Sequence, residues 1–294
     1  MKRIFSAERY LLLGHIVAMI FGLAGIILVL PNVGFQAKLT EFAWGARIFG
    51  WSMAGGGVVY MVLAAAAVAL YAYRTLGIWH WLSFMIPAIA LSLASELLGT
   101  STGFPFGEYR YLSGLGYKIA GLVPFTIPLS WFYLGFSAYI IALAGLKRLE
   151  LGNWLCQLGA IIFGSLCLTS WDFVLDPAMS QAPIPFWIWE QPGAFFGMPY
   201  QNFAGWMGTG VLFMTLAMVL WRIKPFSLPY EDLGLPLAIY LANFAFAAVL
   251  SLAAGFYIPV FLGVILGIVP LVLLYWIATN SNADSKSSTL LTTN

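Results

Sequence analysis

The sequence is poor in the residues that usually hold metals or carry electrons. Its 294 positions contain only two histidines and two cysteines. Membrane di-iron hydroxylases and desaturases need many imidazole ligands, whereas His15 and His80 each stand alone, so we expect no redox metal site and a structural role for both. Cys156 and Cys167 would lie about 16 Å apart along one predicted helix, which is too far for a disulfide.

Charge is also scarce, at 8% of the residues with a net charge of +2. The basic residues stand singly or in pairs, which argues against nucleic acid as a partner, because phosphate binding needs a basic patch. No Walker or Rossmann glycine pattern is present. Any chemistry must therefore run on carboxylic acids, water and apolar shape, and we expect no metal and no cofactor.

Hydrophobic residues, by contrast, make up 62% of the chain, and the mean hydropathy is +0.91. Stretches of about 20 apolar residues recur along the whole length, as needed to cross about 30 Å of hydrocarbon with helices. No segment alternates like a strand of a membrane barrel. The sequence predicts an all-α, polytopic membrane bundle of seven or eight helices. We expect one catalytic domain over residues 1–280 and a disordered polar tail over 281–294.

The basic residues predict how the bundle is oriented. The expected spans are 10–31, 47–73, 78–98, 119–146, 153–175, 201–221, 235–253 and 256–277. With eight spans, nine Lys and Arg residues fall on the side of both termini and four on the other side. The positive-inside rule then places both termini in the cytoplasm. Pro124 and Pro128 are expected to bend the fourth span.

Five of the eleven acidic residues fall on the side opposite the termini, at the ends of two spans or in the loops beyond them: Glu96, Glu108, Asp172, Asp176 and Glu190. Acidic groups near hydrocarbon are costly and usually persist because they bind or transfer something. Glu96 lies near the end of the third span. It is either a carboxylic acid able to give a proton or simply part of a helix end that reaches the interface.

The loop that follows reads Gly103-Phe-Pro-Phe-Gly-Glu-Tyr-Arg-Tyr111. Its Gly and Pro residues predict a fixed, non-helical loop. Its aromatic rings could define an apolar slot and stabilise a passing cation, at about 0.5–2 kcal/mol per ring. The alternative is an interfacial aromatic belt with a local pair between Glu108 and Arg110. The aromatic loop around Glu190 is open to the same two interpretations.

Asp172 and Asp176 stand one helical turn apart at the end of the fifth span, at a distance of about 6 Å. Two carboxylates so close cannot easily both ionise, so one is expected to hold its proton. Binding of Mg²⁺–diphosphate, as in membrane prenyltransferases, is a rival hypothesis, but the second acid-rich helix of those enzymes is missing. In the simplest alternative, Asp176 only ends the helix before Pro177.

Four motifs carry a resemblance to a known family: Ser95-Glu-Leu-Leu-Gly99, Phe104-Pro-Phe-Gly-Glu-Tyr-Arg-Tyr111, Trp171-Asp-Phe-Val-Leu-Asp-Pro177 and Gly197-Met-Pro-Tyr-Gln-Asn-Phe-Ala-Gly-Trp206. Together they resemble the membrane carotenoid 1,2-hydratases of the CruF type, which act on γ-carotene or on bacterioruberin precursors. The similarity extends from the first span to about residue 275. It implies an integral protein of a bacterial membrane that adds water to the terminal C1–C2 double bond of an acyclic ψ end group, on the route to myxol-type glycosides.

The resemblance also implies an apolar carotenoid as partner within the bilayer, a carotenoid glycosyltransferase acting downstream, and no metal, flavin or nicotinamide. A protonated carboxyl would give its proton to C2, and water would add to the C1 cation under a second carboxylate. We hypothesise that Asp172 or Glu96 is the proton donor and that Glu108 or Asp176 is the base. The residues expected to bind substrate or line the cation site are Tyr109, Arg110, Trp171, Trp189, Glu190 and Asn202.

Two alternative functions remain open. Another membrane isoprenoid enzyme is one: a carotenoid cyclase would yield an isomer of unchanged mass, and a prenyltransferase would require diphosphate and Mg²⁺. A transporter or lipid-binding protein is the other, and it predicts an internal inverted repeat with acids near mid-membrane. The acids here lie at one end of the spans and no repeat is visible, which favours an enzyme.

Overall fold

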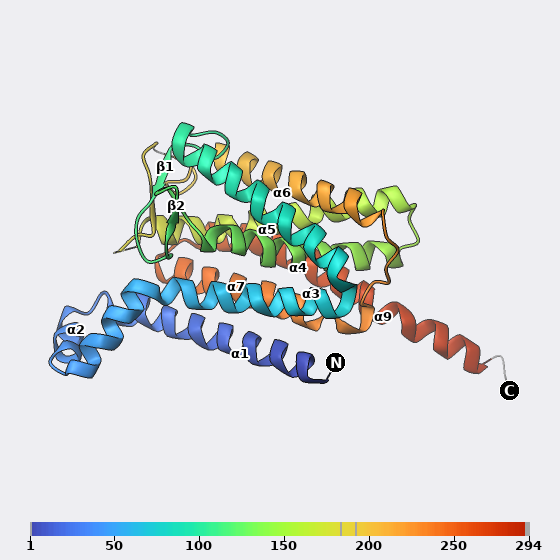
Figure 1. The fold of residues 1–294 in the computed structure, drawn as a ribbon, viewed down its shortest axis with the longest axis horizontal. Coiled ribbons are helices and arrows are strands. Elements are labelled where there is room, and N and C mark those ends of the chain that lie inside the picture. Colours follow the sequence, from blue (N-terminus) through green and yellow to red (C-terminus); the bar gives the residue numbers. More distant parts are fainter. Residues whose placement is uncertain (1, 183, 192, 292–294) are drawn as a thin grey trace.

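The computed structural model describes residues 2–182, 184–191 and 193–291, and it is a bundle of long helices (Figure 1). Within these residues, seven helices are long and apolar enough to cross a membrane, which confirms the predicted polytopic bundle. The first is α1 (Lys2–Ala24) with the π-helical turn η1 (Gly25–Val29), and the short α2 (Val33–Thr40) follows it. The others are α3 (Ala43–Thr102), α4 (Thr126–Arg148), α5 (Asn153–Ser180), α6 (Tyr200–Trp221), α7 (Gly234–Ala253), and a last span built from α8 (Tyr257–Gly263), η3 (Val264–Ile268) and α9 (Val269–Leu291).

The longest helix, α3, turns back on itself at Gly77. The backbone of Gly77 has φ 81° and ψ 170°, a conformation open only to glycine, and it interrupts the helix. The apolar part of α3, Gly57–Thr102, has 46 residues, or about 69 Å of helix, which is more than twice the hydrocarbon thickness. Its two limbs run in opposite directions (Figure 1). Counted by limb, the described residues offer eight apolar helical segments for crossing a membrane, the larger of the two predicted numbers.

Both termini lie at one end of the bundle, and the paired strands lie at the other (Figure 1). The placement of the termini in the cytoplasm stays a prediction. Helix α9 continues to Leu291, so residues 281–291 of the expected polar tail are helical, and residues 292–294 lie outside the described residues.

Helix α4 forms the centre of the bundle. Of the most apolar 18-residue stretch of α4, 94% of the residues are buried, whereas only 11% are buried in the corresponding stretch of the span that contains α1. The helix begins at Thr126, so Pro124 precedes it and Pro128 lies in its first turn, where the backbone N–H groups need no helical partner. The two prolines therefore do not interrupt the span, contrary to the expectation from the sequence.

Helix α5 is longer than predicted. It continues through Pro177 to Ser180, so Asp176 does not end the helix and the simplest alternative for that residue is wrong. Proline removes one backbone donor from a helix but does not compel it to end when neighbouring elements hold it in place. Asp176 consequently lies within the last turns of α5, together with Asp172.

Short strands from distant parts of the chain pair at the end of the bundle opposite the termini, which we call the loop end. Strand β1 (Tyr109–Tyr111) is antiparallel to β4 (Trp187–Trp189), and β2 (Lys118–Ile119) is antiparallel to β3 (Val123–Pro124). The β1–β4 pair joins the loop after α3 to the loop after α5. This pairing places two aromatic segments over the ends of the helices that carry the acids.

Candidate active site

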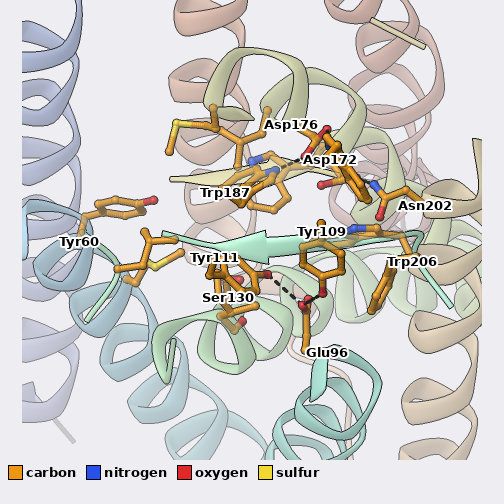
Figure 2. Close-up of a pocket in the computed structure, with 18 residues that line it drawn as sticks. Tyr60, Glu96, Tyr109, Tyr111, Ser130, Asp172, Asp176, Trp187, Asn202 and Trp206 are labelled. Atoms are coloured by element: carbon orange, nitrogen blue, oxygen red, sulfur yellow. Dashed lines mark hydrogen bonds between the residues drawn. The ribbon is translucent and has the colours of Figure 1, made fainter. Parts of the chain in front are cut away.

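Three acidic side chains from two helices meet in one buried cavity at the loop end of the bundle (Figure 2). Glu96 comes from the second limb of α3, and Asp172 and Asp176 come from successive turns of α5. Their exposed fractions are only 2%, 3% and 2%. The cavity has a volume of about 50 Å³, which is room for a few water molecules.

Glu96 is held by three uncharged donors. Its Oε2 accepts hydrogen bonds from the hydroxyl of Tyr109 and, at 2.9 Å, from that of Tyr111. Its Oε1 accepts from Nε1 of Trp131 at 3.1 Å. The tyrosines belong to β1 and the tryptophan to α4, so the carboxyl group joins three elements. Such donors stabilise a carboxylate without neutralising its charge.

Tyr109 and Tyr111 are suited to remain donors. Burial and the neighbouring Glu96 carboxylate raise the pKa of each phenol well above its ordinary value of 10.0, because both disfavour the phenolate. Each hydroxyl therefore keeps its proton at neutral pH and continues to donate it to Glu96.

Asp176 is held in a similar way from the partner strand. Nε1 of Trp187 donates to its Oδ1, and Nε1 of Trp189 donates to its Oδ2 at 2.8 Å. Both carboxyl oxygens are therefore engaged by indole groups of β4.

Asp172 differs from the other two acids. Its Oδ2 accepts a hydrogen bond from Nδ2 of Asn202, on α6, at 2.6 Å. Among the described residues, no donor reaches its Oδ1. Asp172 also lines the cavity, so this carboxyl group has an oxygen left for a ligand.

The alternation of side chains along the two strands produces this arrangement. Tyr109 lies opposite Trp189, and two residues along, Tyr111 lies opposite Trp187. Because successive side chains in a strand point to opposite faces, these four share the face toward the acids. Arg110, between the tyrosines, points the other way and is 58% exposed. One strand therefore supplies donors to α3, and the other supplies them to α5.

Tryptophan rings form the wall of the cavity beside Asn202. The rings of Trp131 and Trp206 stack with centroids 3.9 Å apart and an interplanar angle of 16°. Trp171 meets Trp206 edge-on, with centroids 5.9 Å apart. Trp171 and Trp206 both line the cavity, so it offers aromatic faces close to its carboxyl groups.

Two glycines allow the loop after α3 to close over the helices. A Cβ added at Gly99 would lie 2.7 Å from the ring of Phe106, and one added at Gly205 would lie 2.9 Å from the carbonyl oxygen of Pro105. Both distances are shorter than real Cβ contacts. Glycine at these two positions of α3 and α6 therefore brings Phe106 into the cavity wall.

Among the described residues that line the cavity, none is basic. Three ionised carboxylates buried together without a cation would repel one another and lose their solvation. At least one of them must therefore hold a proton. Asp172 accepts a single hydrogen bond and fits this role better than Glu96 or Asp176, which accept three and two. The site can thus offer one proton next to carboxylates that would stabilise positive charge.

The comparisons with known proteins bear on this arrangement. A family model described as "Carotenoid biosynthesis protein" matches residues 56–270, well over half of the chain. The chain belongs to this family. The matched region contains all three acids of the cavity and the strands β1 and β4.

One relative of this carotenoid biosynthesis protein is the bisanhydrobacterioruberin hydratase of Haloarcula japonica. The two are 40% identical over 126 residues, a stretch that covers 42% of this chain and 40% of the relative. The match therefore spans less than half of either protein. No solved structure matches the chain.

In this family member, the residues predicted for the site divide into two groups. Those that line the cavity are Glu96, Tyr109, Trp171, Asp172, Asp176, Trp189 and Asn202. Glu108, Arg110 and Glu190 are exposed outside it. Nε of Arg110 donates to Oε1 of Glu190 at 2.8 Å. The position of Glu108 gives no support to a role as the base, and the positions of the other two give none to substrate binding.

Sequence reasoning did not assign four aromatic residues of the site: Tyr111, Trp131, Trp187 and Trp206. The patterns Tyr-Arg-Tyr and Trp-Ile-Trp alternate as half-buried strands do, and this alternation could have identified two of the four. Trp131 and Trp206 lie within apolar helices, where the sequence does not distinguish them from other core aromatics.

Neither histidine lines the cavity, and both bond to the backbone. Nδ1 of His15 lies 2.8 Å from the carbonyl oxygen of Tyr60. His80 lies between the carbonyl oxygens of Leu76 and Lys224, at 2.9 and 3.0 Å. In the described part of the chain, no three His, Cys, Asp or Glu side chains are grouped in a way that could hold a metal ion.

Proposed function

We propose that this chain is a membrane carotenoid hydratase, which adds water to the terminal C1–C2 double bond of an acyclic carotenoid end group. The observation that carries the proposal is the set of three buried carboxyl groups, held by uncharged donors in a cavity with no basic residue among its described lining. Membership of the carotenoid biosynthesis family supports it, as does the identity of 40% to a protein named a hydratase.

Asp172 gives the proton in the proposed mechanism. Asn202 fixes the orientation of its carboxyl group through Oδ2 and leaves Oδ1 without a donor among the described residues. The π electrons of the double bond take the proton at C2, and the tertiary cation forms at C1. A positioned general acid of this kind contributes about 10²–10⁴-fold to the rate.

The walls of the cavity stabilise the cation. The indole rings of Trp171 and Trp206 offer faces whose quadrupole attracts positive charge. The carboxylates of Glu96 and Asp176 are already oriented by their donors, so they stabilise the developing charge without reorganisation.

Asp176 acts as the base for water. Water adds to C1 and loses a proton to the Asp176 carboxylate, which leaves a tertiary alcohol. Asp172 lies one turn away, about 6 Å along the same helix face, so the proton can return to it through a water molecule. The reaction consumes one water and changes no net oxidation state, and it therefore requires no oxidant, reductant or redox cofactor.

The substrate in this proposal is γ-carotene or a related carotene with at least one acyclic ψ end, and the product is a 1′-hydroxy carotenoid. The substrate lies within the bilayer, and a carotenoid glycosyltransferase acts on a later product. With cytoplasmic termini, the cavity lies near the opposite membrane face.

Isotope labelling tests the proposal. The chain is expressed in cells that accumulate γ-carotene or lycopene and that grow in ¹⁸O-labelled water. We expect a hydroxylated carotenoid that is heavier than its precursor by one labelled water. A hydroxylated product without ¹⁸O, whose oxygen came from O₂, would overturn hydration, and an isomer of unchanged mass would identify a cyclase instead.

A further inference from the structure

A second, larger cavity adjoins the acid cavity. It has a volume of about 250 Å³ and lies between α1 with η1, the first limb of α3, and the loop 113–115. No charged side chain is among the described residues that line it. The steps of hydration use none of this space, so the cavity is available for the part of a substrate that does not react.

Three residues line both cavities and form the boundary between them: Tyr60, Leu115 and Met179. Each is less exposed than a tenth, at 7%, 2% and 3%. In Figure 2, Tyr60 lies at the side of the acid cavity away from Asn202 and Trp206. Met179 is unbranched and can change rotamer easily, so a thin chain could pass this boundary after a small movement.

The far side of the larger cavity reaches the surface of the bundle. Phe21 and Ile48 line the cavity and are 55% and 42% exposed. Phe21 belongs to the span Ser6–Val29, whose outer face has the apolar character of a lipid contact. The cavity therefore has an opening from which a hydrocarbon dissolved in the bilayer can enter.

Two glycines leave room in the wall that α1 and η1 contribute. A Cβ added at Gly25 would meet nothing within 4 Å, and one added at Gly22 would come no closer than 3.9 Å to the ring of Phe246. Gly25 also begins the π-helical turn η1, and such turns are frequent at functional sites. The Cβ of a larger side chain at Gly25, a residue of the cavity lining, would therefore meet open space.

Resting on the proposed function, we propose that the larger cavity binds the polyene chain of the carotene. The chain enters from lipid past Phe21, and its acyclic end passes Tyr60, Leu115 and Met179 to reach Asp172. An acyclic end is a thin, methyl-branched chain, whereas a cyclised end carries a substituted ring. The buried boundary thus admits the acyclic end, and the apolar lining holds the rest of an uncharged molecule.

Filling the cavity tests this assignment. The variant is Gly25→Trp, and its matched control is Gly208→Trp. Gly208 is an exposed glycine of α6 that lines neither cavity, and a Cβ added there also meets nothing within 4 Å. Two quantities are measured: kcat/KM for hydration of γ-carotene, and the amount of γ-carotene that co-purifies with the protein when Asp172→Asn is also present. The second readout needs no activity.

We expect Gly25→Trp to lower both quantities by about tenfold or more, equivalent to about 1.4 kcal/mol, while Gly208→Trp leaves both unchanged. Gly25→Leu should lie between, and it carries the test against Gly208→Leu if the tryptophan variant does not fold. Equal values for Gly25→Trp and the wild type would overturn the assignment, as would equal losses in Gly25→Trp and its control. Retention of γ-carotene that depends on Gly25, without product in any variant, would support the cavity and contradict the proposed hydration.

Discussion

Acidic side chains lie at both ends of the bundle, and a buried one is present at each, but the partners of these acids differ. At the end with the termini, Arg74 binds Glu8 at 2.7 and 2.8 Å and Asp232 at 2.6 Å. At the loop end, Glu96, Asp172 and Asp176 accept hydrogen bonds only from phenol, indole and amide groups of the described residues.

An arginine partner neutralises the charge of a buried carboxylate and holds it in place, so the acids beside Arg74 serve as ion-pair partners. Their ion pairs instead join α1 and α3 to the turn η2 (Tyr230–Asp232) between α6 and α7. Uncharged donors allow a buried carboxyl group to gain and lose a proton. Under the proposed mechanism, the partner of a buried acid, rather than its burial, distinguishes a structural role from a chemical one.

The largest effect is expected from an acid at the loop end, because the proposed mechanism requires these acids to react. Asp172→Asn keeps the shape of the side chain but removes its acidic proton, so hydration should fall by about 10³-fold. The rate of product formation per folded protein measures this. The matched control is Glu41→Gln, an exposed acid at the end of α2, which should retain wild-type activity. Activity within a few-fold of wild type in Asp172→Asn would remove this residue from the mechanism.

At the other end, Arg74→Gln should affect stability and not chemistry. Glu8 is 1% exposed, so the loss of its cation leaves an unpaired buried carboxylate and should lower the free energy of unfolding by about 3 kcal/mol. Thermal unfolding in detergent measures the change. Arg47→Gln, an exposed position of the same helix, serves as control and should unfold like the wild type. A loss of turnover in Arg74→Gln protein that remains folded would contradict the division between the two ends.

A finer test weakens one donor at the loop end. Trp189→Phe keeps an aromatic ring but removes one of two indole donors to Asp176, and turnover should fall by about tenfold. Trp154→Phe, an exposed tryptophan of α5, should have no effect. Unchanged turnover in Trp189→Phe would show that the indole hydrogen bond does not orient the base.

The smallest effect is expected for the exposed pair. Arg110 and Glu190 are 58% and 53% exposed, and such ion pairs contribute less than about 1 kcal/mol. Glu190→Gln and Glu108→Gln should therefore leave both the melting temperature and hydration near their wild-type values. A strong loss of hydration in either variant would place part of the reaction in the loops outside the cavity.

The sequence predicts most of the fold, because each span must be a long apolar run to cross lipid. The sequence indicates two spans on either side of Gly77, and the structure shows two helical limbs that meet at this residue. The pairing of β1 with β4 could not be read locally, because Tyr109 and Trp189 are far apart in the chain and each strand has only three residues.

The acids of the site were predictable to different degrees. Glu96, Asp172 and Asp176 stand out because a charge within an apolar helix is rare. Glu108 and Glu190 lie in loops, where no periodicity distinguishes a side chain that points inward from one that points outward. The sequence therefore identified the end of the bundle where the buried carboxyl groups gather, but the contacts of individual carboxyl groups required the structure.

The pairing of β1 with β4 also makes the site depend on strand register. A slip of one residue turns every side chain of a strand to the opposite face. On β4 it would replace both indole donors of Asp176 by the side chain of Ile188. On β1 it would withdraw both phenols from Glu96 and point the guanidinium of Arg110 at that carboxylate, giving the loop end the cation that distinguishes the opposite end.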